Sequence, residues 1–315
     1  MKESKIYIAG HKGLVGSSVL DLFRSKGYRN IVTRSSEELD LRNQDVVRSF
    51  IKAEQPDAII LAAARVGGIL ANDQYPYQFL YDNLAIQNNV IDAAHRSNVE
   101  QLIFLGSSCI YPKYAPQPLK EDYLLTGSLE PTNQWYALAK ITGIKLCEAL
   151  RRQYGRRYVS LMPTNLYGPR DNFDLETSHV VPAMIRKFHE AKENGHRPVE
   201  LWGTGSPRRE FLYVHDLAEA VLFAFENNLE ESMYNIGTGK DLTIRKLAEI
   251  IQQTTGHQGP IIWDTTKPDD TPRKLLDVSK IQSEGWHHQT DFRDGLEKTY
   301  RWYLKSKKIL KEVET

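Results

Sequence analysis

The sequence predicts an α/β protein with a doubly wound parallel sheet, followed by a smaller C-terminal α/β region. Short apolar runs alternate with helix-like segments through the first half of the 315-residue chain, and this alternation is typical of parallel sheets with helices on both faces. The first apolar run leads directly into a glycine-rich turn. After Pro169 the alternation becomes irregular, which indicates a change of architecture.

The elements of the first half follow one another through short connections. Apolar runs predict strands at 5–9, 30–33, 58–64, 101–106 and 157–162. Amphipathic segments predict helices at 17–23, 44–54, 76–97 and from 136 to about 154. The loop at 66–69 contains two glycines, and we expect it to be a mobile loop of an active site.

The second half contains fewer regular elements. Helices are expected at 181–193, at 211–220 with Asp216 as the cap, at 242–251 with Thr243 as the cap, and at 296–304. Short strands are expected at 234–237 and 261–263. We therefore expect one domain of residues 1–169 with a returning segment at about 211–237, and a second domain formed by 170–210 and 238–315.

The composition excludes several classes of protein. The chain has 41 Lys and Arg against 40 Asp and Glu, so its charge gives no reason to expect a nucleic-acid partner. No apolar run approaches the roughly 18 residues of a membrane-spanning helix. The two cysteines, Cys109 and Cys147, form neither a disulfide framework nor a metal-ligand spacing. We expect a cytoplasmic protein without a bound metal.

The glycine-rich turn indicates dinucleotide binding. Glycines at every third position follow the first strand, and a helix begins immediately afterwards. Such glycines allow a tight turn and a close approach of a pyrophosphate, while the helix N-terminus supplies free N–H groups. The predicted pyrophosphate-binding residues are Gly10, His11, Lys12, Gly13, Leu14, Val15 and Gly16.

The residues after the second strand favour NADP(H) over NAD(H). An acidic residue here would bind the free 2′-hydroxyl of NAD, whereas this chain has Arg34, Ser35 and Ser36. These groups suit a 2′-phosphate, and Lys12 could join them. In the alternative interpretation Arg34 is solvated, and Glu37 or Glu38 binds the ribose.

A tyrosine and a lysine one helical turn apart, Tyr136 and Lys140, could act on one ligand. A lysine cation favours the phenolate and so lowers the pKa of a neighbouring tyrosine. The pair could give a proton to a carbonyl oxygen while a hydride reaches the carbon. Ser107, at the end of the fourth strand, lies at the edge of the sheet where ligands of such folds bind.

The order of the glycine turn, Ser107, Tyr136 and Lys140 resembles the extended short-chain dehydrogenase/reductase superfamily, which has a Rossmann fold. Motifs at 66–69, 105–112, 130–133, 162–169 and 237–239 resemble the GDP-L-fucose synthase family over nearly the whole chain. The resemblance implies NADPH-dependent conversion of GDP-4-keto-6-deoxy-D-mannose to GDP-L-fucose, by epimerisation at C3 and C5 and reduction at C4. Lys12 and Ser36 depart from the arginines expected in this family, and Trp135 replaces a smaller residue.

The resemblance also implies roles for individual residues. Ser107 would hold the substrate carbonyl, Tyr136 would be the acid/base, and Lys140 would lower the pKa of Tyr136 and hold the nicotinamide ribose. Further cofactor contacts are expected from Asp40, Leu41, Ala63, Leu105, Gly106, Pro163, Thr164, Asn165, Leu166 and His179. The GDP-sugar is expected to contact Ser107, Ser108, Cys109, Asn165, Lys187, Trp202, Arg209 and Asp269. Residues 1–169 would then bind NADP(H), and the second domain would bind the substrate.

Epimerisation needs a second acid/base pair. A C4 keto group acidifies the protons on C3 and C5, and inversion needs a base on one face of the sugar and an acid on the other. The resemblance assigns these roles to Cys109 and His179. From the residues alone, Cys109 could be a small core residue and His179 a surface or capping histidine.

Two other functions remain open. The resemblance also implies a homodimer. The same chemistry could act on a related GDP-keto-deoxysugar, as in GDP-L-colitose synthesis. A non-catalytic NADP(H)-sensing protein is a second alternative, although such a protein would usually have lost Ser107, Tyr136 or Lys140. By resemblance we expect a homodimer formed through the helices near 79–94 and 136–154.

Overall fold

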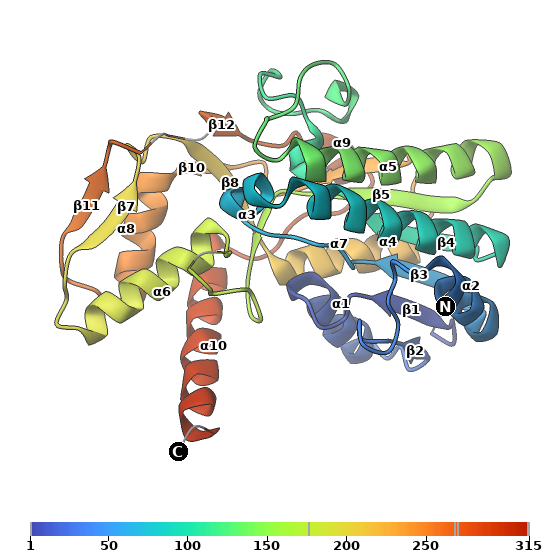
Figure 1. Cartoon of the computed structure of the whole chain (residues 1–315), viewed down its shortest axis with the longest axis horizontal. Helices are drawn as coiled ribbons and strands as arrows, with labels where there is room; N and C mark the ends of the chain where they lie inside the picture. Colours follow the sequence, from blue (N-terminus) through green and yellow to red (C-terminus); the bar gives the residue numbers. More distant parts are fainter. Residues whose placement is uncertain (1, 176, 268, 270, 314–315) are drawn as a thin grey trace.

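The computed structural model describes residues 2–313 except for 176, 268 and 270. A six-stranded sheet forms the larger part of the molecule (Figure 1), and all its neighbouring strands are parallel in the order β2-β1-β3-β4-β5-β9. The strands are β1 (Ile6–Ala9), β2 (Ile31–Val32), β3 (Ala58–Leu61), β4 (Gln101–Leu105), β5 (Arg157–Pro163) and β9 (Met233–Ile236). This arrangement confirms the predicted doubly wound parallel sheet.

Helices cover both faces of this sheet (Figure 1). On one face α1 (Leu14–Ser25) packs against α7 (Val214–Glu226). On the other, α4 (Pro76–Arg96) packs between α2 (Gln44–Glu54) and α5 (Gln134–Tyr154). Strands β1, β3 and β4 are buried along their whole length, which explains why they read as uninterrupted apolar runs.

A smaller α/β region follows in sequence and lies beside the carboxyl ends of the sheet strands. Its strands are β6 (Asn165–Tyr167), β7 (Val199–Trp202), β8 (Arg208–Tyr213), β10 (Asp241–Thr243), β11 (Ile261–Asp264) and β12 (Arg273–Lys274). Strand β8 pairs with β6, β10 and β12, while β7 pairs with β11. The helices are α6 (Val180–Glu193), α8 (Ile244–Thr255) and α10 (Phe292–Val313). Shorter elements are α3 (Ile69–Gln74), α9 (Ser279–Ser283), and the 3₁₀ turns η1 (Ser108–Ile110) and η2 (Glu121–Tyr123).

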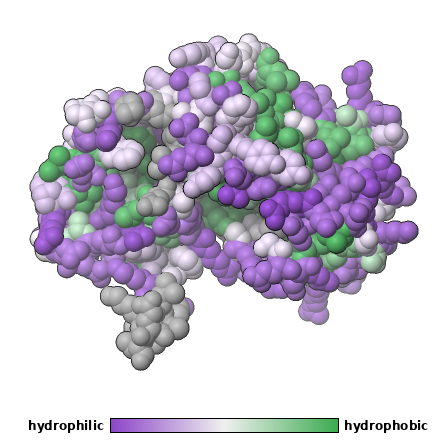
Figure 2. All heavy atoms as spheres, viewed as in Figure 1, coloured by the Kyte–Doolittle hydropathy of each residue, from purple (hydrophilic) through white to green (hydrophobic). Residues whose placement is uncertain are grey.

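The molecule has two separate hydrophobic cores. The first surrounds the six-stranded sheet and also includes Leu276, Val278, Ile281 and Trp286 from the C-terminal part of the chain. The second lies among α6, α8, α10 and β8. Polar residues cover most of the face seen in Figure 2, with a hydrophobic patch over α5. Among the described residues, no helix is long and apolar enough to cross a membrane.

The predicted helix at 211–220 is wrong in its first residues. Phe211, Leu212 and Tyr213 belong to β8 and pair with β6, and α7 begins only at Val214. Asp216 is therefore inside the first turn instead of capping the helix. Its buried carboxylate accepts hydrogen bonds from the backbone of Gln289 and Thr290, both at 3.2 Å. Aromatic and branched residues favour the strand here because a partner strand is present.

Glu210 joins the two parts of the molecule at β8. This fully buried carboxylate accepts hydrogen bonds from the backbone N–H groups of Thr238 at 2.6 Å, Gly239 at 2.7 Å and Leu276 at 2.9 Å. Burial raises the pKa of Glu210, while the N–H donors oppose that change. The bonds fix the turn after β9 and the chain after β12 against the central strand of the smaller region.

Candidate active site

The glycine turn forms a cradle at the point where the strand order reverses, between β1 and β3. Gly10 has a φ of +86°, and a Cβ at this position would lie 2.7 Å from the backbone nitrogen of Ala63. Gly13 caps α1, and Leu14, Val15 and Gly16 form its first turn, whose N–H groups have no intrahelical acceptor. The tight backbone and the helix N-terminus fit the pyrophosphate of a dinucleotide. His11 and Lys12 lie at the rim of the cradle.

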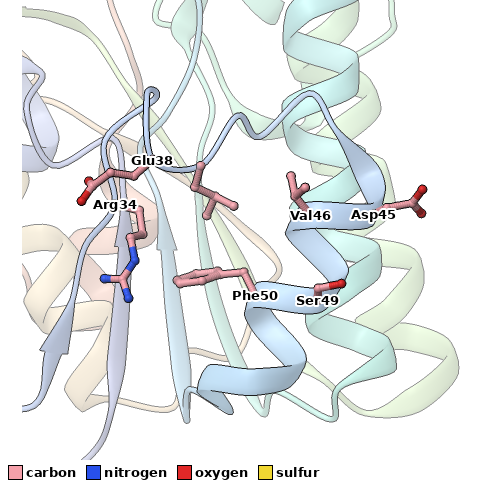
Figure 3. A pocket seen from close by; sticks show the side chains of 7 residues that line it. Arg34, Glu38, Asp45, Val46, Ser49 and Phe50 are labelled. Carbon is pink, nitrogen blue, oxygen red and sulfur yellow. The ribbon is translucent and has the colours of Figure 1, made fainter.

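Arg34 is held by several groups rather than being free in solvent. Its guanidinium lies 3.0 Å from the Glu54 carboxylate, donates to Thr33 O at 2.8 Å, and lies 5.3 Å from the centre of the Phe50 ring. Figure 3 shows the Phe50 ring directed toward the Arg34 side chain. Both residues line an open hollow of about 370 Å³. A fixed cation beside the glycine turn fits the binding of a 2′-phosphate.

A carboxylate also lies in this region. Glu38 accepts a hydrogen bond from the Ser35 backbone at 2.7 Å, and this bond lowers the pKa of Glu38. Ser35 is buried, whereas Ser36 is exposed. Arg34, Ser35 and Ser36, which were assigned to the 2′-phosphate, therefore lie together on the turn after β2. Glu38, the ribose ligand of the alternative interpretation, is hydrogen-bonded to the same turn.

The other predicted cofactor residues lie at the same edge of the sheet. Ala63 lies two residues after β3, beside Gly10, while Leu105 ends β4 and Gly106 follows it. Pro163 ends β5, Thr164 connects it to β6, and Asn165 and Leu166 begin β6. Asp40 is engaged by Arg42 at 2.9 Å, and Leu41 O accepts from Asn89 at 3.0 Å. The Asn165 side-chain amide donates to Glu210 O at 2.9 Å, so one of its two N–H groups already has a protein acceptor.

Ser107 and Cys109 form a contact directly after β4. The Ser107 hydroxyl lies 2.7 Å from the Cys109 sulfur and accepts a weaker bond from the Cys109 backbone at 3.4 Å. Ser108 between them is buried and begins η1. Cys109 is half-buried, in contrast to the fully buried Cys147 of α5. The interpretation of Cys109 as an inert core residue therefore does not fit its position.

Tyr136 and Lys140 lie near this pair on the first turns of α5. Lys140 is buried, donates to Leu105 O at 2.7 Å, and lies 5.7 Å from the centre of the Tyr136 ring. Burial lowers the pKa of Lys140 to about 8. Burial raises the pKa of Tyr136, and the charge of a Cys109 thiolate raises it further. In the free chain the pKa of Tyr136 therefore lies above its usual value, opposite to the expected lowering by Lys140.

His179 lies outside this cluster, directly before α6. Its backbone is extended, and its carbonyl accepts the bond from Ala183 N at 3.1 Å. The side chain keeps an exposed surface, but surrounding protein lowers the pKa of His179 by desolvation, so the neutral ring predominates at pH 7. Among the hydrogen bonds of the described residues, none joins His179 to Ser107, Cys109, Tyr136 or Lys140.

The predicted substrate residues lie on the smaller region. Trp202 is exposed at the end of β7, with the Lys267 ammonium 5.6 Å from its ring. Arg209 is buried in β8, and Lys187 on α6 donates to Glu200 O at 3.3 Å. Asp269 accepts bonds from Thr204 N at 2.9 Å and Thr204 Oγ1 at 2.7 Å, so its carboxylate supports the turn after β7.

The structure adds residues to which no role was assigned from the sequence. Glu130 lies 2.8 Å from Lys113 and within 3.4 Å of the Thr271 hydroxyl. All three line a hollow of about 10 Å³ beside Ser108 and Cys109, which is roughly the space of one water molecule. Asn133, at the start of α5, has a buried Oδ1 without a hydrogen-bond partner. Glu130 and Asn133 belong to the motif at 130–133. The motif therefore indicated this region from the sequence, but it did not indicate which residues they contact.

The Rossmann sheet, the glycine cradle and the Ser107–Tyr136–Lys140 set define a dinucleotide-dependent oxidoreductase of the short-chain type. A family model for the NAD dependent epimerase/dehydratase family matches residues 6–237. The chain belongs to this family and, within it, to the GDP-L-fucose synthase group.

Individual relatives are similar over nearly the whole chain. A protein of Arabidopsis thaliana named GDP-L-fucose synthase 1 is 55% identical, with 97% of this chain and 94% of the relative aligned. A Yersinia pseudotuberculosis protein named GDP-L-colitose synthase is 41% identical, with 96% and 99% aligned. The crystal structure of a GDP-L-fucose synthetase from Naegleria fowleri bound to NADP has 26% identity and a TM-score of 0.88, with 98% and 96% covered.

Proposed function

We propose that this protein is an NADPH-dependent enzyme that converts GDP-4-keto-6-deoxy-D-mannose to GDP-L-fucose. The observation that carries the proposal is the contact between Ser107 and Cys109 beside Tyr136 and Lys140. This arrangement places the groups needed for ketone reduction next to a thiol that can exchange protons. A simple reductase needs only Ser107, Tyr136 and Lys140. Membership of the GDP-L-fucose synthase group supports epimerisation as well as reduction.

In the first stage, Cys109 removes the proton from C3 or C5 of the keto-sugar, and His179 returns one to the opposite face. The C4 carbonyl accepts the electron pair as an enolate, and the Ser107 hydroxyl donates a hydrogen bond to that oxygen. At pH 7 the His179 ring is mostly neutral because its pKa is lowered, so it acts as the acid only after it has taken up a proton, and the lowered pKa then favours release of that proton. Proton exchange with solvent then returns Cys109 and His179 to their starting protonation states, and the same step at the second carbon completes the epimerisation.

In the second stage, the C4 carbonyl is reduced. Bound NADPH supplies the hydride, and the glycine cradle with Lys12, Arg34, Ser35 and Ser36 would hold it. Tyr136 donates a proton to the C4 oxygen while Ser107 keeps that oxygen in place. Lys140 is fixed by Leu105 O, so its ammonium remains near Tyr136 and favours the phenolate that forms.

The proposal is tested by product analysis. The purified protein is incubated with GDP-4-keto-6-deoxy-D-mannose and NADPH in deuterated water, and the product is examined by mass spectrometry and NMR. GDP-L-fucose with deuterium at C3 and C5 is the expected product. A reduced sugar that retains the mannose configuration at both carbons would contradict the proposed epimerisation.

A related GDP-keto-deoxysugar is the second candidate substrate. The 41% identical relative named GDP-L-colitose synthase supports this alternative, although the identity to the relative named GDP-L-fucose synthase 1 is higher. Competition between the two keto-sugars, measured as the ratio of kcat/KM values, distinguishes the candidates. A non-catalytic NADP(H)-sensing function is disfavoured because Ser107, Tyr136 and Lys140 are all present.

We also propose a homodimer formed through α4 and α5. Tyr77 and Tyr81 on α4 stack on one another at the surface, and Leu138 on α5 is exposed as well. Figure 2 shows the hydrophobic patch over α5. Analytical ultracentrifugation should give a dimer for the natural chain and a monomer for Leu138→Glu.

We also propose that the protein is cytoplasmic. We propose further that the chain divides into a cofactor domain and a substrate domain, as predicted from the sequence. Both cysteines are free thiols, which suits a reducing compartment. The two hydrophobic cores support the division, with the exception that residues 276–286 pack on the first core. Cell fractionation and limited proteolysis test these two points.

A further inference from the structure

Three exposed side chains between β6 and α6 are hydrogen-bonded to one another. Asn172, Asp174 and Thr177 all have exposed side chains, yet each is bonded to another member of this set. We call these three residues the clasp. The mechanism described above uses none of them, although they lie within seven residues of His179 in the sequence.

Thr177 is the centre of the clasp because all its polar groups are engaged. Its N–H donates to Asp174 Oδ1 at 3.0 Å, and its hydroxyl donates to the same oxygen at 2.9 Å. The hydroxyl accepts from the Asn172 amide at 2.8 Å, and the carbonyl accepts from Gly68 N at 3.1 Å. A residue held in this way has little freedom to change its backbone conformation.

His179 lies between the clasp and α6, so its backbone is fixed on both sides. Ser178 N donates to Asp174 O at 3.0 Å before it, and Ala183 N donates to His179 O at 3.1 Å after it. Arg186 of α6 also donates to Phe173 O at 3.1 Å. The position of the His179 ring therefore depends on the clasp even though the clasp does not touch the ring.

The Gly68 contact connects the clasp to the part of the molecule that carries Tyr136. Asn72 donates to Gly67 O at 2.9 Å and to Gly68 O at 3.0 Å, which fixes this loop. A Cβ at Gly67 would lie 3.1 Å from the Phe79 ring, and Phe79 packs edge to face against Tyr136, with 6.4 Å between ring centres. A continuous series of contacts thus runs from Thr177 to Tyr136.

We propose that Asp174 and Thr177 are positioning residues for epimerisation, which hold His179 in register with the site that contains Cys109 and Tyr136. This inference rests on the proposed function of His179 as the acid. An acid that is displaced by about 1 Å loses on the order of 100-fold in rate, whereas the proton for the reduction comes from Tyr136. Loosening the clasp should therefore slow epimerisation and leave reduction intact.

The test measures how the keto-sugar divides between two products. Thr177→Val keeps the shape and the backbone groups of Thr177 but removes its hydroxyl, and Thr177→Ser keeps the hydroxyl. Each variant is incubated with GDP-4-keto-6-deoxy-D-mannose and NADPH, and epimerised and directly reduced products are separated and quantified by NMR. Asp174→Asn is a second variant that keeps an acceptor oxygen but removes the charge. Thr126→Val is the matched control, because Thr126 bonds only within an exposed turn, to Tyr123 O.

For Thr177→Val and Asp174→Asn, we expect the ratio of epimerised to directly reduced product to fall about 10-fold or more. The product ratio of Thr177→Ser should lie within about threefold of that of the natural chain, and Thr126→Val should not change the ratio. An equal loss of both products, or an unchanged ratio in Thr177→Val, would overturn the inference.

His179→Gln separates failure of the inference from failure of the proposed function. If this variant shifts the product ratio and Thr177→Val does not, His179 remains the acid and the clasp has no positioning role. If His179→Gln leaves the ratio unchanged, the acid role is wrong and the inference fails with it.

Discussion

The hydroxyl of Ser107 lies 2.7 Å from the sulfur of Cys109. One hydrogen bond thus joins a residue assigned to carbonyl reduction with the residue assigned to proton abstraction. The bond follows from η1, which turns the chain immediately after β4 and brings the two side chains to the same side. The two stages of the reaction therefore share a group, and a change at Ser107 should affect both.

Ser107→Ala should slow reduction by about 100-fold, because the C4 oxygen loses a hydrogen-bond donor. It should also slow the alkylation of Cys109 by iodoacetamide at pH 7.5 by about fivefold, because the Cys109 sulfur loses its hydrogen-bond partner, the Ser107 hydroxyl. NADPH oxidation and mass spectrometry of the labelled peptide measure the two effects. The buried Cys147 is the internal control and should remain unlabelled.

Tyr136→Phe should lower the rate of NADPH oxidation by 100-fold or more, on the order expected for loss of a general acid. Deuterium uptake from solvent at C3 and C5 should continue, because Cys109 and His179 remain. Tyr154→Phe, at the far end of α5, should behave like the natural chain. Loss of deuterium uptake in Tyr136→Phe would mean that the two stages are not separable.

Lys140 should destabilise the fold at neutral pH. Its pKa is about 8 in the folded chain, against roughly 10.4 in an unfolded one, so the unfolded state binds more protons between these values. The cost of the buried charge is fully present below pH 8 and is relieved as the pH rises. Relative to Lys140→Met, the natural chain should gain about 3 kcal/mol between pH 7 and pH 11.

Chemical denaturation of both proteins across this pH range measures the difference. Lys145→Met is the control, because Lys145 lies on the same helix but is exposed and pairs with Glu148 at 2.7 Å. A constant difference between the natural chain and Lys140→Met at all pH values would show that the pKa of Lys140 is not lowered.

Arg34→Met should weaken NADP⁺ binding about 10-fold and change NAD⁺ binding less than twofold, because the guanidinium would contact only the 2′-phosphate. Isothermal titration with each dinucleotide measures this selectivity without turnover. Arg29→Met, in the exposed turn before β2, is the matched control. An equal loss of affinity for both dinucleotides would assign Arg34 to folding through its contact with Glu54.

Glu210→Ala should lower the free energy of unfolding by about 3 kcal/mol, since three backbone N–H groups lose their acceptor in a buried place. Thermal and urea denaturation measure the change. Glu200→Ala, on the exposed side of β7, should have little effect. A loss below about 1 kcal/mol would indicate that water replaces the carboxylate.

The sequence predicted the six-stranded sheet well because its central strands β1, β3 and β4 are buried along their whole length and read as apolar runs. It did not predict β10 or β12, which have three and two residues and pair with β8 from distant parts of the chain. The misplaced start of α7 has a similar cause. Residues 211–213 are a strand only because β6 lies beside them, and local sequence does not report that neighbour.

The site was predictable where a residue's type determines its chemistry. The sequence indicated Ser107, Cys109, Tyr136 and Lys140, and the structure brings them together. It could not show that Asp269 and Asn165 are already bonded to Thr204 and Glu210, because those partners are distant in the chain. Nor could it show that burial raises the pKa of Tyr136, since burial depends on how α5 packs.

The bond between Gly68 N and Thr177 O joins two backbone groups. It therefore depends less on the identity of the side chains than the side-chain contacts around it do. Most replacements at position 177 leave its carbonyl in place, so the connection can persist while neighbouring side chains diverge. Position 68 is less permissive, because a Cβ there would lie 3.0 Å from Ser178 O. In a library of variants with random residues at positions 68 and 177, selection for folded protein should retain glycine at 68 more strongly than threonine at 177.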